Sequence, residues 1–213
     1  MKAKGARGFW EGFFKTVSFS IDQPLISQYT ESRQSQGGIP MNYRPARESD
    51  LPSLVSMSQQ AIAYFRVNGI DQWQKGEPNK EELCKAIKEH KLYVLENAGK
   101  AAAMITLAPG PELSYAEIDG AWLNQESYYA FHRVCVEDSC KGQGIVSQLF
   151  SQSEKLVLAL GFTNVRIDTH PDNRSMQRAL EKNGYVPCGR LVLKDGSEAG
   201  DPRLAYQKIL IPF

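Results

Sequence analysis

Residues 131 to 161 constrain the fold of this chain more than any other segment. FHRVCVE (131–137) alternates as a strand does, and SCKGQG (139–144) carries the glycines of a turn. Gly161 stands where the end of a helix favours glycine. Between them, apolar residues recur at the spacing of one helix face: Ile145, Val146, Leu149, Phe150, Leu156, Val157 and Leu160. A strand, a glycine turn and an amphipathic helix in this order predict an α/β protein.

The glycine turn is a candidate anion-binding site. The first N–H groups of a helix lack acceptors within the helix, and Gly142 and Gly144 let a ligand approach that backbone closely. The same glycines also suit a tight turn that binds nothing, so this feature alone leaves both interpretations open. A dinucleotide-binding fingerprint requires a glycine where this chain has Ser147, and the Gly-Lys-Ser/Thr ending of a P-loop is absent. Both nucleotide-binding folds are therefore set aside.

Local patterns predict helices and strands over the rest of the chain. Asn79 and Glu82 fit an N-cap with its N3 partner, which opens a helix to about His90. The connection 108–129 contains Pro, Gly and acidic residues, and such loops often carry functional sites. Strands are expected at 42–47, 92–96, 101–107, 164–169, 185–193 and 203–210, helices at 51–65 and 176–184, a loop at 66–79 and a tight turn at 194–196.

The charge balance and the cysteines narrow the class of partner. The 213 residues include 25 basic and 24 acidic side chains, so no global field would attract a nucleic acid. The four cysteines form no CxxC pair, which predicts reduced thiols, a cytoplasmic location and no metal site. No apolar run approaches the roughly 20 residues that span a bilayer, so no membrane partner is expected.

Residues 1–40 are interpreted as an N-terminal extension ahead of a domain at 41–213. The segment 27–40 is polar and ends in Gly-Gly-Ile-Pro, which is typical of a linker. Apolar and aromatic residues between positions 9 and 19 have helical spacing and a basic flank, so an amphipathic helix on a membrane or a partner is one interpretation. An extension that packs on its own domain is the alternative. Secretion is disfavoured because no cleavage site follows.

With this order of elements, the sequence resembles the GNAT family of acyl-CoA-dependent N-acetyltransferases over about residues 43 to 210. The family signature is Arg or Gln, two residues, Gly, one residue, then Gly or Ala, and KGQGIV (141–146) fits it except at Lys141 and Val146. The block DNRSMQRALEKNGY (172–185) resembles the helix that follows the next strand in the family. The resemblance implies a mixed α/β fold with a central, mostly antiparallel sheet, splayed at the cofactor site and flanked by helices.

The resemblance also implies acetyl-CoA as co-substrate and assigns residues to it. Backbone groups of the strand before the turn would pair with the pantetheine arm and polarise the thioester carbonyl. The N–H groups of the turn would hold the pyrophosphate, with a lysine adding charge. The cofactor-binding residues expected on this basis are Val134, Cys135, Val136, Lys141, Gly142, Gln143, Gly144, Ile145, Val146, Ser147 and Asn173.

Amine acetylation requires a base, because an ammonium ion has no lone pair with which to attack a thioester. His132 is the expected catalytic residue, since it resembles the position of the catalytic histidine in the arylalkylamine acetyltransferases of the family. Strand alternation predicts that His132 shares a face with Val134 and Val136. A structural histidine bonded at a strand edge is the alternative interpretation.

Other routes for the protons stay open. Reaction with an amine that is already deprotonated would need no base at all. The tyrosine that protonates the leaving thiolate in many members of the family is replaced here by Leu180. The carboxylates that could act instead of a histidine, directly or through water, are Glu117, Asp119 and Glu137.

The loops 66–79 and 109–128 correspond to the variable acceptor pocket of the family. Trp73 and Trp122 are expected to wall it, and Glu117 to hold a cationic amine. The sequence thus predicts an N-acetyltransferase that moves an acetyl group from acetyl-CoA to a primary amine of a small molecule or peptide, by direct transfer in a ternary complex. A catalytically idle acyl-CoA-binding or regulatory domain is the alternative, and a homodimer is left open.

Overall fold

The computed structural model describes residues 41–211. The expected extension, with its linker and its aromatic segment, lies outside the described residues, so the domain boundary near residue 40 stays a prediction. In the described part of the chain, no helix is long and apolar enough to cross a membrane.

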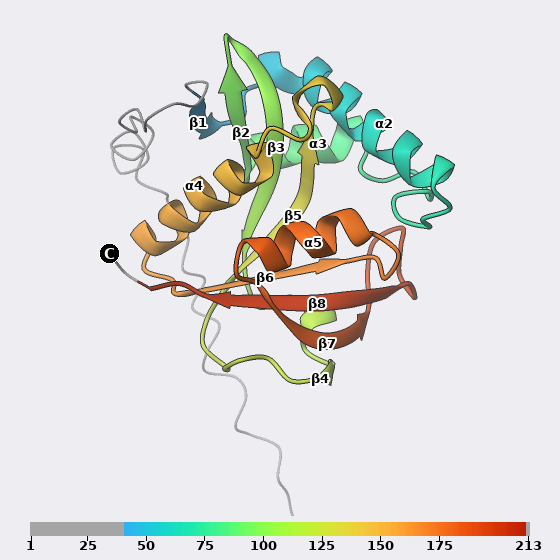
Figure 1. Cartoon of the computed structure of the whole chain (residues 1–213), viewed down its shortest axis with the longest axis vertical. Helices are drawn as coiled ribbons and strands as arrows, with labels where there is room; N and C mark the ends of the chain where they lie inside the picture. Colours follow the sequence, from blue (N-terminus) through green and yellow to red (C-terminus); the bar gives the residue numbers. More distant parts are fainter. Residues whose placement is uncertain (1–40, 212–213) are drawn as a thin grey trace, which may run out of the picture.

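A sheet of eight strands forms the centre of the fold (Figure 1). Neighbouring strands are antiparallel except β5 and β6, which run parallel. In sheet order the strands are β1 (Asn42–Pro45), β2 (Leu92–Asn97), β3 (Lys100–Pro109), β5 (Tyr129–Val136), β6 (Asn164–Thr169), β8 (Pro202–Ile209), β7 (Val186–Val192) and β4 (Asp119–Gly120). This mixed, mostly antiparallel sheet confirms the expected fold class.

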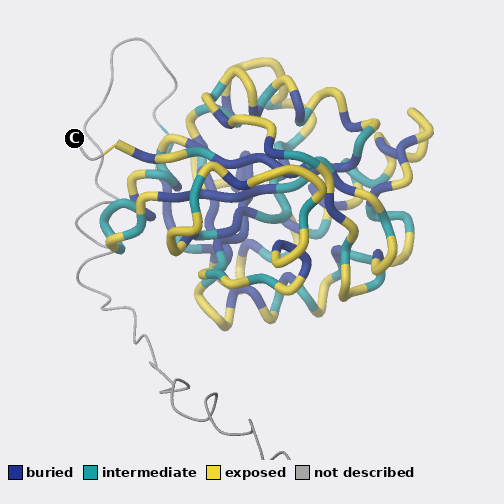
Figure 2. The backbone as a smooth tube through the Cα atoms, turned by 90° about the horizontal axis from the view of Figure 1, so that it is seen from below, coloured by how far each residue is buried: buried dark blue, intermediate teal, exposed yellow. Residues whose placement is uncertain are grey.

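Two pairs of helices cover the two faces of the sheet. Leu54 and Leu83 come from the first pair and pack with Met104 of β3, whereas Leu149 and Leu180 come from the second pair and pack on the opposite face. The central strands are therefore buried along much of their length (Figure 2). The first pair is α2 (Leu51–Val67) and α3 (Lys80–Lys88), and the second pair is α4 (Ile145–Ala159) and α5 (Arg174–Lys182).

Local signals in the sequence set the ends of these helices. The Asn79 side chain accepts the N–H of Glu82 at 3.0 Å, and the Glu82 carboxylate accepts the N–H of Asn79 at 3.1 Å, so the predicted capping box opens α3. Gly161 follows α4 with a φ of 84°, a conformation that glycine adopts without strain. The single-turn helices η1 (Glu48–Asp50), η2 (Leu113–Tyr115) and η3 (Asp138–Cys140) occupy loops.

The two halves of the sheet part between β5 and β6. Their pairing comprises only three residue pairs and ends at Phe131 and Ile167, although β5 continues to Val136. In Figure 1, β2 and β3 accordingly run up the picture while β6 and β8 cross it. The second half of β5 is hydrogen-bonded to β3 alone, which opens the sheet on its other side.

A bulge in β5 lies at this opening. Met104 is opposite Cys135 and Thr106 is opposite His132, so two residues of β5 share one partner position on β3. One of the two, Arg133, has a φ of 50°, in the left-handed region that non-glycine residues rarely adopt.

The bulge overturns one expectation about β5. Val134 and Val136 pack with Phe131 on the face covered by α4, while Cys135 belongs to the core on the α2 and α3 face. His132 follows Phe131 and points to the opposite face, with Cys135. The prediction that His132 shares a face with both valines was therefore wrong, because an extra residue reverses the alternation.

The connection from β7 to β8 also differs from the expected tight turn at 194–196. It runs over residues 193–201, where the N–H of Gly200 donates a hydrogen bond of 2.8 Å to the backbone oxygen of Leu193. The short strand β4, which pairs with Gly189 and Arg190 of β7, was not expected. It has two residues, too few for a pattern.

We predict that Asn79→Ala lowers the free energy of unfolding by about 1 kcal/mol, because the substitution leaves the first turn of α3 without its side-chain acceptor. Urea denaturation followed by circular dichroism measures the change. Lys80→Ala, at the next and exposed position, is the matched control and should leave the midpoint nearly unchanged. Equal midpoints for both variants would contradict the role of the cap.

Candidate active site

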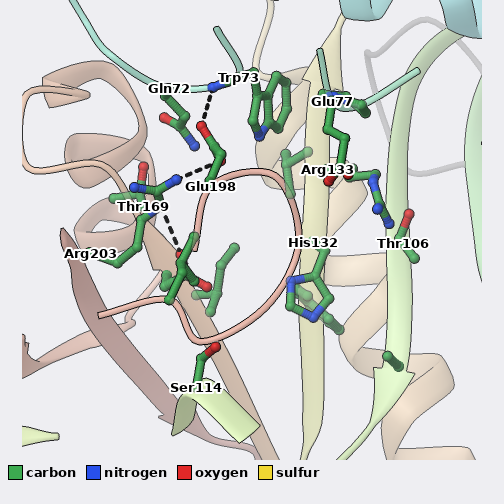
Figure 3. A pocket seen from close by; sticks show the side chains of 18 of the residues that line it. Gln72, Trp73, Glu77, Thr106, Ser114, His132, Arg133, Thr169, Glu198 and Arg203 are labelled. Atoms are coloured by element: carbon green, nitrogen blue, oxygen red, sulfur yellow. Dashed lines mark hydrogen bonds and ion pairs between the residues drawn. The ribbon is translucent and has the colours of Figure 1, made fainter. Parts of the chain in front are cut away.

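A cavity of about 500 Å³ lies where β5 has parted from β6 (Figure 3). Its walls come from both halves of the sheet, with α3, β3 and β5 on one side and the end of β6 and the loop 193–201 on the other. Residues of the loop 68–79 close a further side. Four residues expected from the sequence line it: Trp73, His132, Val134 and Asn173.

His132 is held by a carboxylate in this cavity. Its Nε2 lies 2.7 Å from Oε1 of Glu112, and the two side chains are 26% and 25% exposed. When Nε2–H donates to Glu112, the lone pair of the neutral ring lies on Nδ1. Nδ1 makes no hydrogen bond to any residue in 41–211. The arrangement leaves Nδ1 available to take a proton from a group in the cavity.

The surroundings raise the pKa of His132. Burial of the ring acts to lower that pKa and is the largest single effect. The hydrogen bond to Glu112 and the negative charges of Glu112 and Asp168 act in the opposite direction and together outweigh both burial and the positive charge of Arg133. His132 is thus a stronger base than an ordinary histidine, and it is neutral only at a correspondingly higher pH.

Glu112 is a site residue that the sequence patterns did not reveal. No local pattern marks it, and its place follows from strand pairing: Glu112 follows β3 by three positions, and β3 ends with Pro109 opposite Tyr129 at the start of β5. The residues just after β3 must therefore lie close to the first residues of β5. The N–H of Glu112 also donates to the hydroxyl of Tyr128 at 2.9 Å, which fixes the loop beside β5.

The glycine turn lies at the N-terminus of α4 as expected. Gly142 and Gly144 have φ angles of 77° and 74°, and a Cβ at either position would meet no atom within 4 Å. The N–H groups of residues 142–144 donate to no acceptor in the described chain. Lys141 lies beside them, with Nζ 2.5 Å from Asp138. This backbone is open to an anion.

The other residues expected at the cofactor occupy the strand and the helix on either side of this turn. Val136 is half-buried against the core, and Cys135 is buried, which raises the pKa of its thiol to about 12 and keeps it protonated. Ile145 is buried at the start of α4, while Val146 and Ser147 are half-buried and Gln143 is exposed. None of these residues lines the cavity.

Asn173 is the N-cap of α5. Its side-chain oxygen accepts the N–H of Met176 at 3.1 Å, and its amide donates to Gln72 at 3.0 Å. The residue is 4% exposed. Asn173 thus joins α5 to the loop 68–79 at the edge of the cavity.

The residues expected to hold the acceptor lie in different places. Trp73 lines the cavity with a φ of 60°, and its ring meets Phe65 edge-on at 5.5 Å. Trp122 is buried outside the cavity lining, with the Arg166 guanidinium 4.2 Å from its ring centre. Glu117 also lies outside the lining, 79% exposed and 2.7 Å from Lys194. The structure thus brings only Trp73 together with His132.

The alternative bases do not meet in the cavity. Asp119 is exposed in β4, and Glu137 accepts hydrogen bonds from Gln60 and Ser139 beyond the end of β5. Neither lines the cavity. Leu180 belongs to α5 and is fully buried in the core. Within residues 41–211, no group of three or more His, Cys, Asp or Glu side chains could hold a metal ion.

A buried ion pair fixes the loop that carries Trp73. Glu198 accepts the N–H of Trp73 and lies 2.5 Å from Nη2 of Arg203 (Figure 3). Arg203 also lies 3.5 Å from Asp168, which accepts the hydroxyl of Tyr115 at 2.7 Å. The Glu198 and Arg203 side chains are 11% and 2% exposed, so loss of Arg203 would leave the buried charge of Glu198 unpaired.

A mixed sheet that opens between two parallel strands, beside a glycine turn at a helix N-terminus, defines the acyl-CoA-dependent acyltransferase class. The sequence profile of the Acetyltransferase (GNAT) family matches residues 55–185, more than half of the chain, and the chain belongs to this family. The family uses acetyl-CoA, which is therefore the co-substrate.

Solved structures agree with this assignment. A GNAT-family acetyltransferase from Streptococcus agalactiae is 28% identical, with a TM-score of 0.73 over 85% of this chain and 100% of that one. A ribosomal-protein-alanine N-acetyltransferase from Brucella melitensis (16% identity, TM-score 0.58, 79% and 99% covered) and a Salmonella typhimurium acetyltransferase with its cofactor acetyl-CoA (12%, 0.58, 81% and 95%) share the fold. A search of curated proteins found no match.

We predict that Gly144→Asn weakens acetyl-CoA binding by about tenfold or more, because a side chain at this position obstructs the backbone N–H groups, and a hydrogen bond to a charged group contributes about 1.5–3 kcal/mol. Asparagine tolerates the left-handed conformation best among residues with a side chain. Gly161→Asn, at a similar φ of 84° beyond the other end of α4, is the matched control. Calorimetric titration measures both, and equal affinities would place the phosphates elsewhere.

Proposed function

We propose that the chain is an N-acetyltransferase that transfers the acetyl group of acetyl-CoA to a primary amine of a small molecule or peptide, directly within a ternary complex. The observation that carries the proposal is the His132–Glu112 pair, a base and its carboxylate hydrogen-bonded at 2.7 Å in the cavity beside the parted strands. A cytoplasmic location is part of the proposal and is supported by the four free thiols in residues 41–211.

In this proposal the donor is held between β5 and β6. The backbone of β5 beyond Phe131 has no partner on β6, so an amide chain such as pantetheine can pair with it as an added strand does. An N–H at the bulge that points to the thioester oxygen would stabilise the charge developing there by about 3 kcal/mol. The N–H groups of residues 142–144 bind the phosphates.

On the acceptor side, Nδ1 of His132 takes a proton from the ammonium group, and Glu112 stabilises the resulting imidazolium. The freed nitrogen lone pair attacks the thioester carbon. A C–N bond forms, the C–S bond breaks, and its electron pair leaves on sulfur as a thiolate. The acylated nitrogen then loses its second proton to solvent, which leaves the neutral amide. Solvent also protonates the thiolate, since Leu180 has no acidic group.

A catalytically idle acyl-CoA-binding domain is the second candidate, because Lys141, Val146 and Leu180 depart from the family pattern. Titration with acetyl-CoA, with NAD and ATP as controls, tests the binding that both candidates share. Thiol release over a panel of primary amines then separates them. Turnover with any amine supports the transferase, binding without turnover supports the idle domain, and no binding of acetyl-CoA contradicts both.

We predict that His132→Ala lowers kcat at neutral pH by about 10²–10⁴-fold, the usual contribution of a general base, with acetyl-CoA affinity nearly unchanged. The reason is that the ring acts on the amine and not on pantetheine. Steady-state kinetics and calorimetry measure the two quantities. His90→Ala, at an exposed position after α3, is the control. Equal turnover in the His132 variant and the wild type would remove His132 from the mechanism.

We predict that Glu112→Gln moves the acidic limb of the kcat/KM profile to lower pH. Catalysis needs neutral His132, so the rate rises with pH through the pKa of that ring, and the carboxylate of Glu112 raises this pKa in the wild type. Removing the charge lowers the pKa of His132, and the maximal rate falls because a neutral amide stabilises the imidazolium less than a carboxylate does. A limb at the same pH in both enzymes would assign it to another group.

A further inference from the structure

The lining of the cavity is more acidic than the chain as a whole. The sequence is balanced, with 25 basic and 24 acidic side chains, whereas the lining holds seven carboxylates and four lysine or arginine side chains. Such an excess in a concave site favours a cationic ligand. The carboxylates are Glu77, Glu82, Glu89, Glu112, Asp168, Asp195 and Glu198, and the cations are Lys85, Lys91, Arg133 and Arg203.

Every one of the four lining cations already has an acidic partner. Glu89 lies 2.7 Å from Lys91 and 3.8 Å from Lys85. Glu82 lies 3.1 Å from Nη2 of Arg133, and the pair formed by Glu198 and Arg203 has been described above. The lining therefore offers no unengaged positive charge to an acceptor that bears a carboxylate.

Two lining carboxylates have no such partner. Glu77 and Asp195 form no ion pair with a lysine, arginine or histidine anywhere in residues 41–211. Glu77 lies close to the loop that carries Asp195, because Oε2 of Glu77 is 3.5 Å from the position that a Cβ on Gly196, the next residue after Asp195, would take. The Ser114 hydroxyl donates a long hydrogen bond of 3.5 Å to the Asp195 carboxylate.

An unpartnered hydroxyl beside His132 also indicates a ligand at this place. Thr106 is directly opposite His132 in the β3–β5 register, so the two side chains share a face of the sheet, and both line the cavity (Figure 3). Thr106 is 3% exposed, and its Oγ1 has no hydrogen-bond partner in the described chain. A buried hydroxyl without a partner is costly, and an N–H donor bound next to His132 would satisfy it.

From these contacts we infer that the acceptor carries two cationic nitrogens, as a short diaminoalkane does. The inference rests on the proposed function, because one amine must reach Nδ1 of His132 beside Thr106. The second ammonium group binds the carboxylates of Glu77 and Asp195, and Trp73, which also lines the cavity, offers a ring face that attracts a cation. The cavity of about 500 Å³ suits a small molecule of this kind.

The experiment compares three acceptors of similar length with saturating acetyl-CoA: 1,4-diaminobutane, butylamine and 4-aminobutanoate. The expected order of kcat/KM is diamine, then monoamine, then the zwitterion, with at least about a tenfold step from the diamine to butylamine. Equal values for the diamine and butylamine overturn the inference while leaving the proposed function intact. No turnover with any of the three, and none with a wider panel of amines, contradicts the proposed function itself.

Variants then locate the second cation. In Glu77→Gln with Asp195→Asn, the ratio of kcat/KM for the diamine to that for butylamine should fall by about tenfold, mainly through KM for the diamine. Glu81→Gln, an exposed carboxylate on α3 outside the cavity lining, is the matched control and should keep the wild-type ratio. A double variant that keeps the wild-type ratio would overturn the assignment of these two carboxylates. Each variant is first checked for an unchanged unfolding midpoint.

Discussion

The parting of β5 from β6 is the constraint on which the rest of the structure depends. Pairing ends at Phe131 and Ile167, and the next residues of β5 form a bulge in which Arg133 has a φ of 50°. A non-glycine residue in that conformation costs on the order of 1–3 kcal/mol, so the surroundings must hold it. The Glu82 carboxylate holds the Arg133 side chain by accepting a hydrogen bond of 3.1 Å from its Nη2, and the same carboxylate accepts the N–H of Asn79 at the start of α3. The bulge, the helix and the cavity wall are therefore coupled.

Because only three residue pairs join β5 and β6, contacts across the cavity must hold the two halves of the sheet at a fixed opening. An ion pair and a buried hydrogen bond contribute to this, since Lys75 pairs with Asp201 and the N–H of Trp73 donates to Glu198, whose carboxylate is held by Arg203. Lys75 and Asp201 lie 2.6 Å apart, but Lys75 is 41% exposed, and such surface pairs contribute about 0–1 kcal/mol. Glu198 and Arg203 are buried, and breaking such a pair costs about 3–5 kcal/mol. The buried pair therefore sets the position of the loop that carries Trp73.

Features that depend on neighbours in sequence were predictable, and features that depend on pairing between distant segments were not. The cap formed by Asn79 and Glu82 is local, and so is the succession of strand, glycine turn and helix around Gly144. The bulge at Arg133 leaves no local mark, because FHRVCVE is equally compatible with strict alternation. Glu112 reaches His132 only because β3 and β5 pair. Position along the chain alone therefore gave no reason to choose Glu112 over Glu117 as the partner of His132.

A comparison of the two proton transfers explains why the proposed reaction can proceed with a leucine at position 180. An alkylammonium with a pKa of about 10.4 must lose its proton before attack, which costs about 4.6 kcal/mol at pH 7. A thiolate whose conjugate acid has a pKa of about 8.5 leaves unprotonated at a cost of about 2 kcal/mol. A base that removes the proton of the ammonium group therefore lowers the barrier by more than an acid that protonates the thiolate could. The carboxylate of Glu112 raises the pKa of His132 and so brings it closer to the pKa of the amine. The chain thus assists the costlier proton transfer, although Leu180 provides no acid for the other one.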